Sequence, residues 1–419
     1  LALHLRPEWS LRSRFRQVFP TGASVGFPAR LDIPAPILEI ARTLDGAGYE
    51  AWCVGGSLRD TLLGHPQTDY DIATSARPDE VQRLFPRTVA VGIKHGTVGV
   101  LDRRRELHEV TTFRRDVLTD GRHAVVQYGV SLEDDLARRD FTINAIAYHP
   151  LRHEWRDPFA GERDLRAGLV RAVGAPEQRF QEDFLRILRA LRFAARFDFA
   201  IDSATWEAAQ AASSGLGQLS AERVREEWFK GLQTARSIHR LVSLWIEVGA
   251  ARVWLPELAE MASQIKLLPE PGPDIRDPVL LTALLVPNPS SVLTRLKSSN
   301  AQIARAAAIE AGPEQPPALD EISVRRWMSV VGPAVDDLTE IWQLRHGREA
   351  PWRQTSGSIR GQGDPLTRAD LAIDGSDLLA LGVTGPAVGR ILSALLERVL
   401  DNPRLNTREA LLALAKEIS

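Results

Sequence analysis

A change in residue pattern near residue 176 restricts the fold of this chain more than any other feature. Between about residues 31 and 150, short apolar runs alternate with turn-forming residues, as in AWCV, YDIAT, TVGVL, HEVTTF and FTINAIAY. Such runs predict the strands of a mixed sheet with a few helices. Beyond residue 176 these runs stop, and amphipathic helical stretches follow, such as residues 178–197 and 220–233. The sequence therefore predicts an α+β chain with a mixed-sheet head and an all-helical remainder.

The length of the chain also bears on its organisation. Its 419 residues exceed what one hydrophobic core usually serves, so several domains are expected. Pro, Gly and Ser cluster at residues 267–278 and 351–365, which predicts loops or linkers there. The expected segments are an N-terminal extension at 1–30, a head at 31–150, a neck at 151–235, a helical body at 236–350 and a helical tail at 366–419.

The composition is that of a soluble, folded protein. Apolar residues make up 44% of the chain, and no apolar run approaches the roughly 18 residues that cross a membrane. The net charge of −2 means that any phosphate-binding surface must be local. A single cysteine cannot form an intramolecular disulfide, which predicts a cytoplasmic location. The neighbours of this residue, Cys53, predict a buried strand position rather than a nucleophile.

The motif with the clearest chemistry is GGSLRD at residues 55–60, followed by Asp69 and Asp71. A strand ending in two glycines lets the backbone approach a ligand closely, and a helix starting near Ser57 would point free N–H groups at a triphosphate. Arg59 would add a charge-assisted contact. Residues i and i+2 of a strand share a face, so Asp69 and Asp71 would project together and share divalent cations.

Taken alone, an Asp-x-Asp pair is a weak signal, because it also occurs in surface turns and in glycosyltransferases. Two adjacent carboxylates without a counterion repel each other, so capture of a metal ion would explain their spacing. The preceding glycine motif further favours a metal site. With Mg²⁺ or Mn²⁺, one ion would activate an attacking hydroxyl and the other would hold the triphosphate. In HEVTTF, Glu109 is either a third carboxylate or a solvated strand residue, and the pattern does not separate the two.

Two further clusters place polar side chains beside predicted core segments. The triplet RRD at residues 138–140 precedes FTINAIA, where the Asp could accept a hydrogen bond from a ribose hydroxyl; a charged loop is the alternative. On the predicted helix 178–197, Phe184 belongs to the core stripe, Arg186 lies almost opposite, and Asp183 flanks it. Asp183 and Arg186 could reach one ligand together, or form an ordinary surface ion pair.

Taken together, these motifs resemble those of the class II tRNA nucleotidyltransferases, the family of CCA-adding enzymes and bacterial poly(A) polymerases. The matching stretches, in order between about residues 48 and 232, are VGGSLRDTLLG, TDYDIAT, EVTTFRRD, EDDLARRDFTINAIAY, DPFAGERDLRAGLVRAVG, QEDFLRILRALRFAARF and SAERVREEWFKGL. The resemblance implies a polymerase β-like nucleotidyltransferase head followed by a helical neck, body and tail. It also implies template-independent addition of C, C and A, from CTP and ATP, to the 3′ end of tRNA with release of pyrophosphate.

The resemblance implies roles for individual residues as well. Asp69 and Asp71 match the metal-binding carboxylates, and Glu109 stays the candidate for a third catalytic carboxylate on its strand position. The residues expected to bind the nucleotide are Gly55, Gly56, Arg59, Asp60, Arg139, Asp140, Asn144, Asp183, Arg186 and Arg189. The neck helices are expected to be braced by a motif that contains Glu222, Arg223 and Arg225. Past residue 232 the match weakens to a Gly-Pro turn at residues 385–386, before a helix expected to contact tRNA.

Within the family, Asp183 and Arg186 match the pair that reads the base. Cytosine and adenine both present an amino donor beside a ring-nitrogen acceptor, whereas uracil and guanine present a carbonyl beside an N–H group. One acceptor next to one donor would therefore accept CTP and ATP and reject UTP and GTP, because a mismatched edge leaves polar groups unpaired.

The alternatives concern the product of the reaction. Residues 114–130 retain the flexible loop that CC-adding members lack, which favours full CCA addition or A addition, with Ala124 standing where Pro is common. An A-adding enzyme or poly(A) polymerase of the same family is the nearest alternative, and a catalytically silent RNA-binding protein is a remote one. Residues 280–291 lack the His-Asp pair of a phosphohydrolase domain, so no hydrolase activity is expected. The oligomeric state stays open.

Overall fold

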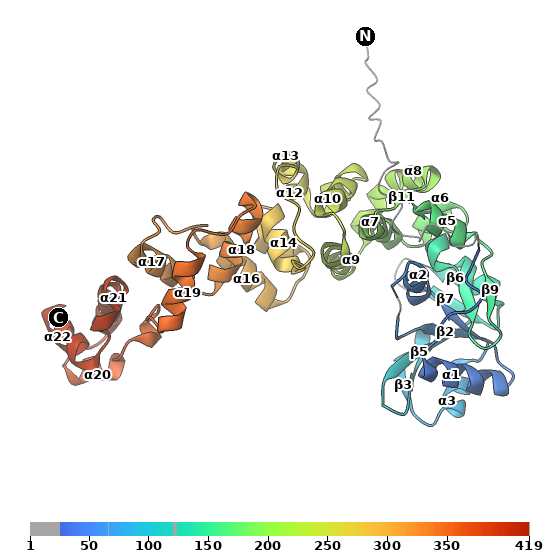
Figure 1. Cartoon of the computed structure of the whole chain (residues 1–419), viewed down its shortest axis with the longest axis horizontal. Coiled ribbons are helices and arrows are strands. Elements are labelled where there is room, and N and C mark those ends of the chain that lie inside the picture. The colour runs from blue at the N-terminus through green and yellow to red at the C-terminus, as the bar shows by residue number, and fades with distance from the viewer. Residues whose placement is uncertain (1–25, 66, 120–123, 419) are drawn as a thin grey trace, which may run out of the picture. The chain divides into compact units, whose positions relative to one another are not determined.

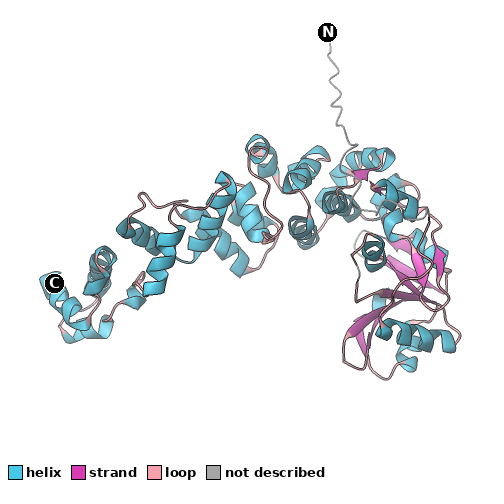
Figure 2. Ribbon diagram, viewed as in Figure 1, coloured by secondary structure: helices cyan, strands magenta, loops and turns pink. Residues whose placement is uncertain are grey.

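A computed structural model of the chain describes residues 26–65, 67–119 and 124–418, and these form two compact units. The first unit contains the residues up to Ser220 together with Glu247–Val253. The second contains Ala221–Ile246 and the residues from Trp254 onward. In Figure 2 the strands are gathered in the first unit, and within the described residues the second unit is built of helices. The predicted mixed-sheet head is confirmed, and the remainder is largely helical, although short strands at residues 154–156, 169–170 and 200–201 correct the expectation of an all-helical neck.

The first unit is organised by a mixed sheet. Its strands are β1 (Ala51–Val54), β2 (Asp71–Thr74), β3 (Thr88–Gly92), β4 (Thr97–Leu101), β5 (Leu107–Thr112), β8 (Ala147–His149) and β9 (Glu154–Arg156). Among the described residues, seven strands pair in the order β3-β4-β5-β2-β1-β8-β9. Neighbours are antiparallel except β2 and β5, which run parallel with Ile72 opposite Val110. This parallel pair places the beginnings of two strands side by side.

Two smaller strand pairs accompany the sheet. They are the antiparallel hairpin β6 (Arg114–Thr119) and β7 (Ala124–Tyr128), and the parallel pair β10 (Leu169–Val170) and β11 (Ala200–Ile201). The runs AWCV, TVGVL and HEVTTF form strands as predicted. The run FTINAIAY is a strand only at its end, because a 3-10 turn, η3 (Thr142–Asn144), occupies its beginning.

Helices cover the sheet and continue the first unit. They are α1 (Ala35–Gly46), α2 (Gly56–Leu62), α3 (Pro78–Leu84), α4 (Leu132–Ala137), α5 (Gly161–Ala167), α6 (Pro176–Glu182), α7 (Leu185–Phe197) and α8 (Ser203–Ala211), with the 3-10 turns η2 (Ile93–His95) and η4 (Ser213–Gln218). Helices α1 and α3 lie beside each other, and each contacts the sheet (Figure 1).

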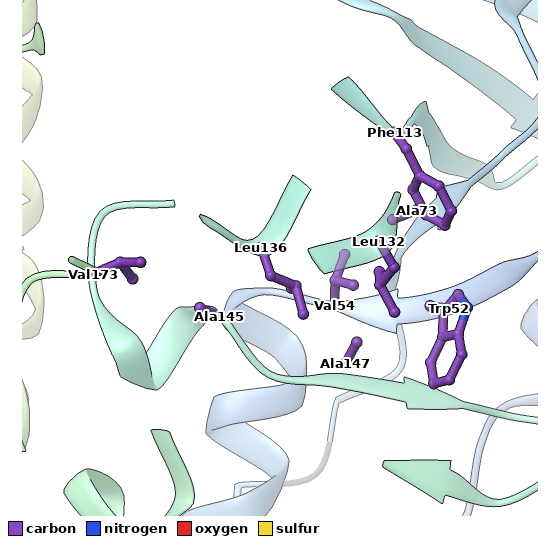
Figure 3. Close-up of a cluster of buried hydrophobic side chains, with 9 residues drawn as sticks. All are labelled: Trp52, Val54, Ala73, Phe113, Leu132, Leu136, Ala145, Ala147 and Val173. Atoms are coloured by element: carbon purple, nitrogen blue, oxygen red, sulfur yellow. The ribbon is translucent and has the colours of Figure 1, made fainter. Parts of the chain in front are cut away.

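Strand β1 is covered on both faces. All four of its residues are buried, and Trp52 and Val54 cluster with Leu132 and Leu136 of α4, as Figure 3 shows. Side chains alternate along a strand, so Cys53 faces the other side of the sheet, where α1 contacts β1. Burial raises the pKa of the Cys53 thiol. The predicted buried strand position of this cysteine is confirmed.

The second unit contains a longer series of helices. They are α9 (Ala221–Thr234), α10 (Ile238–Glu247), α11 (Ala250–Trp254), α12 (Pro256–Glu260), α13 (Ala262–Ile265), α14 (Pro278–Leu285), α15 (Pro289–Arg295), α16 (Asn300–Ala311), α17 (Glu321–Val331), α18 (Val335–His346), α19 (Arg353–Gln362), α20 (Gly375–Ala380), α21 (Pro386–Asp401) and α22 (Arg408–Ile418), with the 3-10 turns η5 (Gly332–Ala334), η6 (Arg368–Asp370) and η7 (Pro403–Leu405). Glu247 of α10 and residues 250–253 of α11 belong to the first unit, and Trp254 of α11 belongs to the second. None of the helices in the described ranges is both long and apolar enough to cross a bilayer.

The two segments predicted as loops differ in outcome. The stretch before α14 is a loop, as predicted. The prediction for residues 351–365 is wrong, because they contain helix α19. Gly and Ser have low helix propensity, but burial of Trp352 and Ile359 holds the helix in place. The indole of Trp352 also donates to the hydroxyl of Thr339 at 3.1 Å.

Contacts within the second unit anchor its first and last helices. Glu222 of α9 pairs with Lys297 at 3.1 Å, and Arg225 donates to the backbone carbonyl of Lys297. This predicted bracing motif therefore ties α9 to the segment that follows α15. At the C-terminal end, Leu378, Leu395 and Leu411 are central to a separate apolar cluster built from α20, α21 and α22. The tail thus has a core of its own.

Candidate active site

Strand β1 ends in a turn that requires glycine. Gly55 has a φ of +82°, and a Cβ atom there would lie 3.2 Å from Nη1 of Arg139 and 3.3 Å from Oδ2 of Asp71. A side chain at this position would be strained and would crowd both charged groups. Helix α2 begins at the next residue, Gly56, and is only seven residues long. The turn, the Asp71 carboxylate and the Arg139 guanidinium therefore lie together.

The parallel register of β2 and β5 brings two carboxylates to the same place. Ile72 lies opposite Val110, so one residue earlier on each strand Asp71 lies beside Glu109. This geometry favours the third-carboxylate interpretation of Glu109 over that of an isolated strand residue. Asp69 lies outside the strand, because β2 begins only at Asp71. The expected strand alternation from Asp69 to Asp71 is therefore wrong, although the two residues remain close enough for their charges to interact.

The charges around Asp71 oppose one another. Burial of its carboxylate raises the pKa of Asp71, the Arg139 guanidinium lowers it, and the carboxylates of Glu109 and Asp69 raise it. The resulting pKa lies above the ordinary value for aspartate. The Asp71 carboxylate thus lies at the Gly55 turn, with Glu109 beside it on β5 and Asp69 near enough for its charge to act on Asp71.

Arg139 is held in this position by buried partners. Its Nη2 donates to Asp135 at 3.2 Å, and its Nη1 donates to the backbone carbonyl of Asn144 at 3.4 Å. The Asp135 side chain is 1% exposed and also pairs with Arg138 at 2.8 Å. Burial raises the pKa of Asp135, but Arg139 and Arg138 outweigh it, so the pKa lies below its usual value. A charged carboxylate therefore fixes both arginines of the predicted ribose motif.

Arg59 lies in a buried polar network. Its Nε donates to Asp60 at 2.8 Å and its Nη1 donates to Asn144 at 2.6 Å. Its guanidinium also lies over the rings of Phe193 and Phe197, at 4.8 and 4.9 Å from their centroids. These contacts join the head to α7 and give Arg59 a scaffold role. The triphosphate contact expected from the sequence stays a prediction.

Asp140 accepts hydrogen bonds at both carboxylate oxygens. Its Oδ1 accepts from the backbone N–H of Phe141 at 2.8 Å and from Asn144 at 2.9 Å. Its Oδ2 accepts from Nε and Nη2 of Arg189, both at 2.7 Å. Burial raises the pKa of Asp140, but the charge of Arg189 and these hydrogen bonds lower it to about 2. Since a carboxylate has about four lone-pair sites, all of them are used, and a ribose hydroxyl would have to replace a partner.

Two arginines hold α7 against the head. Arg196 donates to Asp60 at 2.8 Å, and Arg189 pairs with Asp140 at 2.7 Å. Residues seven apart lie on one face of a helix, so both arginines point toward the head from the same side of α7. The predicted nucleotide-binding residues Asp60, Asp140 and Arg189 are therefore part of one connection between the head and this helix.

The predicted helix over residues 178–197 is interrupted, which corrects the expected placement of the base-reading pair. Helix α6 ends at Glu182, and α7 begins at Leu185. Asp183 lies between them in an extended conformation, and its Oδ1 accepts from the backbone N–H of Leu185 at 3.0 Å. Asp183 therefore caps α7 instead of flanking Arg186 on a continuous helix.

Arg186 lies in the first turn of α7 and is largely buried. Its Nη1 donates to Glu182 at 2.6 Å and to the backbone carbonyl of Arg179 at 3.1 Å. Its Nη2 donates to the backbone carbonyl of Arg138 at 3.0 Å. The side chain is 12% exposed, so its guanidinium is largely shielded from solvent. Arg186 is a fixed donor at the joint between α6 and α7.

Sequence reasoning missed His108, which precedes Glu109 on β5. This residue is 4% exposed, and Nδ1 of its ring lies 3.3 Å from Oδ1 of Asp69. The signal was present in the alternation of HEVTTF, which puts His108 on the same buried face as Val110. Because it contacts Asp69 and lies next to Glu109 in the chain, His108 is a further candidate site residue.

Comparisons with known proteins decide the family. The model described as "Poly A polymerase head domain" matches residues 51–171, and the model described as "Probable RNA and SrmB-binding site of polymerase A" matches residues 198–261. A CCA-adding enzyme from Latilactobacillus sakei is 36% identical over 398 residues, which covers 91% of this chain and 98% of that relative. The chain belongs to the CCA-adding enzyme family. The resemblance stated from the motifs is confirmed.

Solved structures of CCA-adding enzymes share this architecture. The Bacillus stearothermophilus CCA-adding enzyme in complex with CTP matches with a TM-score of 0.76 and 32% identity, covering 91% of this chain and 96% of that chain. The Thermotoga maritima CCA-adding enzyme complexed with tRNA-CCA matches with a TM-score of 0.60 and 21% identity, covering 91% and 95% of the two chains. The latter likeness shows the fold. The nucleotidyltransferase fold expected for the head is thereby confirmed.

Proposed function

We propose that this member of the CCA-adding enzyme family adds C, C and A, from CTP and ATP, to the 3′ end of tRNA without a nucleic-acid template, releasing pyrophosphate. The observation that carries the proposal is the position of Asp71 at the Gly55 turn beside Arg139, with Glu109 next to it on β5 and the charge of Asp69 acting on it. These residues lie within the segment that matches the head-domain family model. Phosphoryl transfer depends mainly on charge held in place around the reacting groups, and these residues provide that arrangement.

The three carboxylates would hold the divalent cations, with Mg²⁺ as the expected ion and Mn²⁺ as the alternative. Their chemistry fits, because hard divalent cations prefer carboxylate oxygens. The raised pKa of Asp71, to which burial and then Glu109 and Asp69 contribute, also fits a site completed by positive charge. Bound cations would supply Lewis-acid stabilisation of the charge on the triphosphate and on the attacking hydroxyl.

The residues of the chain itself would orient the nucleotide. Gly55 and Gly56 leave room for the triphosphate beside the carboxylates, and Arg139 supplies positive charge next to Asp71. Within the described residues the Nε of Arg139 has no hydrogen-bond partner, so this guanidinium keeps a donor for a phosphate or ribose oxygen. Asp140 and Asn144 would take part in ribose recognition by exchanging one of the partners that they hold in this structure.

Base selection would fall to Asp183 and Arg186. Arg186 is fixed by Glu182 and by the Arg138 carbonyl, so its direction is set before a nucleotide arrives. Asp183 follows the end of α6 and adjoins the same helix start. A fixed donor beside an acceptor would pair with the edges of cytosine and adenine and leave uracil and guanine with unpaired groups.

The partners and segments follow from the same proposal. The neck at residues 151–235 would present the base-reading pair, and the body at 236–350 and tail at 366–419 would bind tRNA. The tail fits such a role because it has its own apolar core. We place the reaction in the cytoplasm, which agrees with the reduced, buried state of Cys53.

The decisive experiment supplies the enzyme with tRNA that lacks its last one, two or three nucleotides, together with CTP, ATP or both. Completion of all three substrates to CCA supports the proposal. Incorporation of only the terminal A, or continued A addition to other RNA ends, would identify an A-adding enzyme or a poly(A) polymerase. Absence of metal-dependent incorporation would indicate a catalytically silent RNA-binding protein. The described part of the β6–β7 hairpin lies in the segment that CC-adding members lack, which supports CCA addition or A addition over CC addition alone.

A further inference from the structure

His108 of β5 lies between two carboxylates. Its Nδ1 is 3.3 Å from Oδ1 of Asp69, and its Nε2 is 3.6 Å from Oδ2 of Asp102. The residue is only 4% exposed. A ring buried in a packed interior cannot turn without displacing its neighbours, so β5 sets the position of both ring nitrogens.

Asp102 is a fixed support on the far side of the ring. Its Oδ1 accepts hydrogen bonds from the backbone N–H groups of Arg104 and Glu106, each at 2.8 Å. The side chain is 7% exposed. Its second oxygen faces the imidazole, and the loop between β4 and β5 holds it there. The strand and the burial therefore hold the histidine in place, with the Asp102 carboxylate 3.6 Å from Nε2.

Asp69 is the least constrained of the three site carboxylates. Its side chain is 68% exposed, and it precedes β2, whereas Asp71 and Glu109 lie in paired strands. In the part of the chain that the structure describes, the one hydrogen bond made by the Asp69 side chain is to His108. The orientation of this carboxylate thus depends on a single neighbour.

We propose that His108 is a positioning residue for Asp69, holding its carboxylate in the orientation that divalent-cation binding requires. The proposal rests on the proposed function, in which Asp69 is a metal ligand. A ligand oriented in advance loses less conformational freedom when the cation binds. Partners of this kind, one step removed from the metal, typically change metal affinity by about 10- to 100-fold.

The same region offers a rival interpretation, a separate metal site formed by Asp102, Glu106 and His108. Their ligand atoms lie within 4.8 Å of one another. Two observations favour the positioning role. Glu106 is exposed, and one oxygen of Asp102 is already committed to two backbone N–H groups. Only the rival interpretation needs the Glu106 carboxylate, so this residue separates the two.

The test measures Mn²⁺ binding to the full chain by the electron paramagnetic resonance signal of free Mn²⁺, alongside kcat for CTP incorporation. His108→Leu removes the hydrogen-bonding nitrogens, whereas His108→Asn keeps an N–H group near the place of Nδ1. We expect His108→Leu to weaken Mn²⁺ binding by about 10-fold and to lower kcat, and His108→Asn to stay within about 3-fold of wild type. Glu106→Gln is the matched control and should bind Mn²⁺ as wild type does.

The outcomes separate this proposal from the proposed function. If Asp69→Ala weakens Mn²⁺ binding but folded His108→Leu does not, the positioning role is refuted and the metal assignment stands. If Asp69→Ala has no effect on Mn²⁺ binding, the metal assignment itself fails and takes the positioning role with it. Equal losses in His108→Leu and His108→Asn, or a loss in Glu106→Gln, also overturn the positioning role. Should His108→Leu not fold, His108→Phe replaces it, because it keeps an aromatic ring without ring nitrogens, and unchanged Mn²⁺ affinity in that folded variant overturns the role.

Discussion

Asp71 lies close to charged groups of both signs, namely the Arg139 guanidinium and the carboxylates of Glu109 and Asp69. Burial and two neighbouring carboxylates raise its pKa against the pull of Arg139. Other carboxylates of this unit are balanced differently, since Asp135 and Asp140 each have arginine partners and lowered pKa values. Asp71 therefore differs from these two carboxylates in carrying negative charge that its arginine neighbour does not offset.

Removing either aspartate of the Asp69 and Asp71 pair should abolish most activity. Asp69→Ala or Asp71→Ala is expected to reduce kcat for CTP and ATP incorporation by several orders of magnitude, because the reaction depends on charge held at the triphosphate. Asp79→Ala serves as a control, since Asp79 is an exposed residue of α3 that pairs only with Arg83 in the described structure. Near-normal turnover in either site variant, with its fold intact, would refute the metal assignment.

The lowered pKa of Asp140 should make the free energy of unfolding depend on pH. Its pKa falls from 3.8 to about 2 on folding, so its ion pair stabilises the native state above pH 3.8 and loses this contribution as the pH falls toward 2. The shift corresponds to about 2 kcal/mol. Asp140→Asn should therefore unfold more easily than wild type at pH 7, and the difference should shrink between about pH 4 and 2. Denaturant unfolding across this range measures it, and a constant difference contradicts the assignment.

At the level of elements, the break between α6 and α7 is a feature that hydrophobic periodicity does not predict. Apolar residues continue at helical spacing through residues 178–197, so the pattern predicts one helix. The backbone instead extends at Asp183, which then caps α7 through the Leu185 N–H group. A cap inside an apolar repeat leaves the repeat unchanged, and only the backbone conformation shows it.

The sheet gives a second example of this limit. The strands AWCV and HEVTTF, the Gly55 turn and the Asp69–Asp71 pair could all be predicted from residue type and spacing. The closeness of Asp71 and Glu109 could not, because it depends on the parallel register of β2 and β5. The proposed role of His108 likewise depends on its contact with Asp69, which lies 39 residues earlier in the chain. Pairing of this kind is a tertiary property.

The α6–α7 joint carries the prediction on base choice. Asp183→Ala or Arg186→Ala should reduce discrimination against UTP and GTP by about 10-fold or more, since a charged hydrogen bond contributes about 1.5 to 3 kcal/mol. Incorporation of all four nucleotides on a tRNA acceptor measures this. Asp183→Ala also removes a helix cap, which costs about 1 kcal/mol, so thermal unfolding is measured in parallel.

The surface pair of Arg83 and Asp79 offers a control for this experiment. Both side chains are exposed, and removing an exposed pair should change stability by roughly 0 to 1 kcal/mol without changing base preference. If folded Asp183→Ala and Arg186→Ala both keep the preference for CTP and ATP, selectivity resides elsewhere, and the joint is only scaffold.

For the whole molecule, the attachment of the tail is the feature to test. Arg325 of α17 donates to Asp364 at 2.7 Å and to the backbone carbonyl of Leu400 at 2.9 Å, and both charged side chains are buried. Arg325→Ala would leave the Asp364 carboxylate unpaired, at a cost of about 3 to 5 kcal/mol. We expect a raised KM for tRNA. The KM for CTP should stay unchanged, because the proposed metal-binding carboxylates Asp69, Asp71 and Glu109 lie in the first unit.

The neighbouring residue provides the comparison. Arg326 pairs with Glu397 and Asp401, but these side chains are exposed, so Arg326→Ala should cost at most about 1 kcal/mol and leave both KM values near wild type. Parallel steady-state titrations of tRNA and CTP with the two variants test this. A matching rise in the KM for CTP in Arg325→Ala would contradict a tail that serves only tRNA.

The full occupancy of Asp140 has a consequence for repeated turnover. All of its acceptor positions are taken before a nucleotide arrives, so any sugar hydroxyl that it receives must displace Arg189 or Asn144. Such a replacement trades one hydrogen bond for another, and its net free-energy gain is small. A pocket that works by replacement holds each nucleotide weakly and recovers its own partners when the sugar leaves. This property would suit an enzyme that binds three nucleotides in succession for one RNA end, because Asp140 regains its partners Arg189 and Asn144 each time a nucleotide leaves.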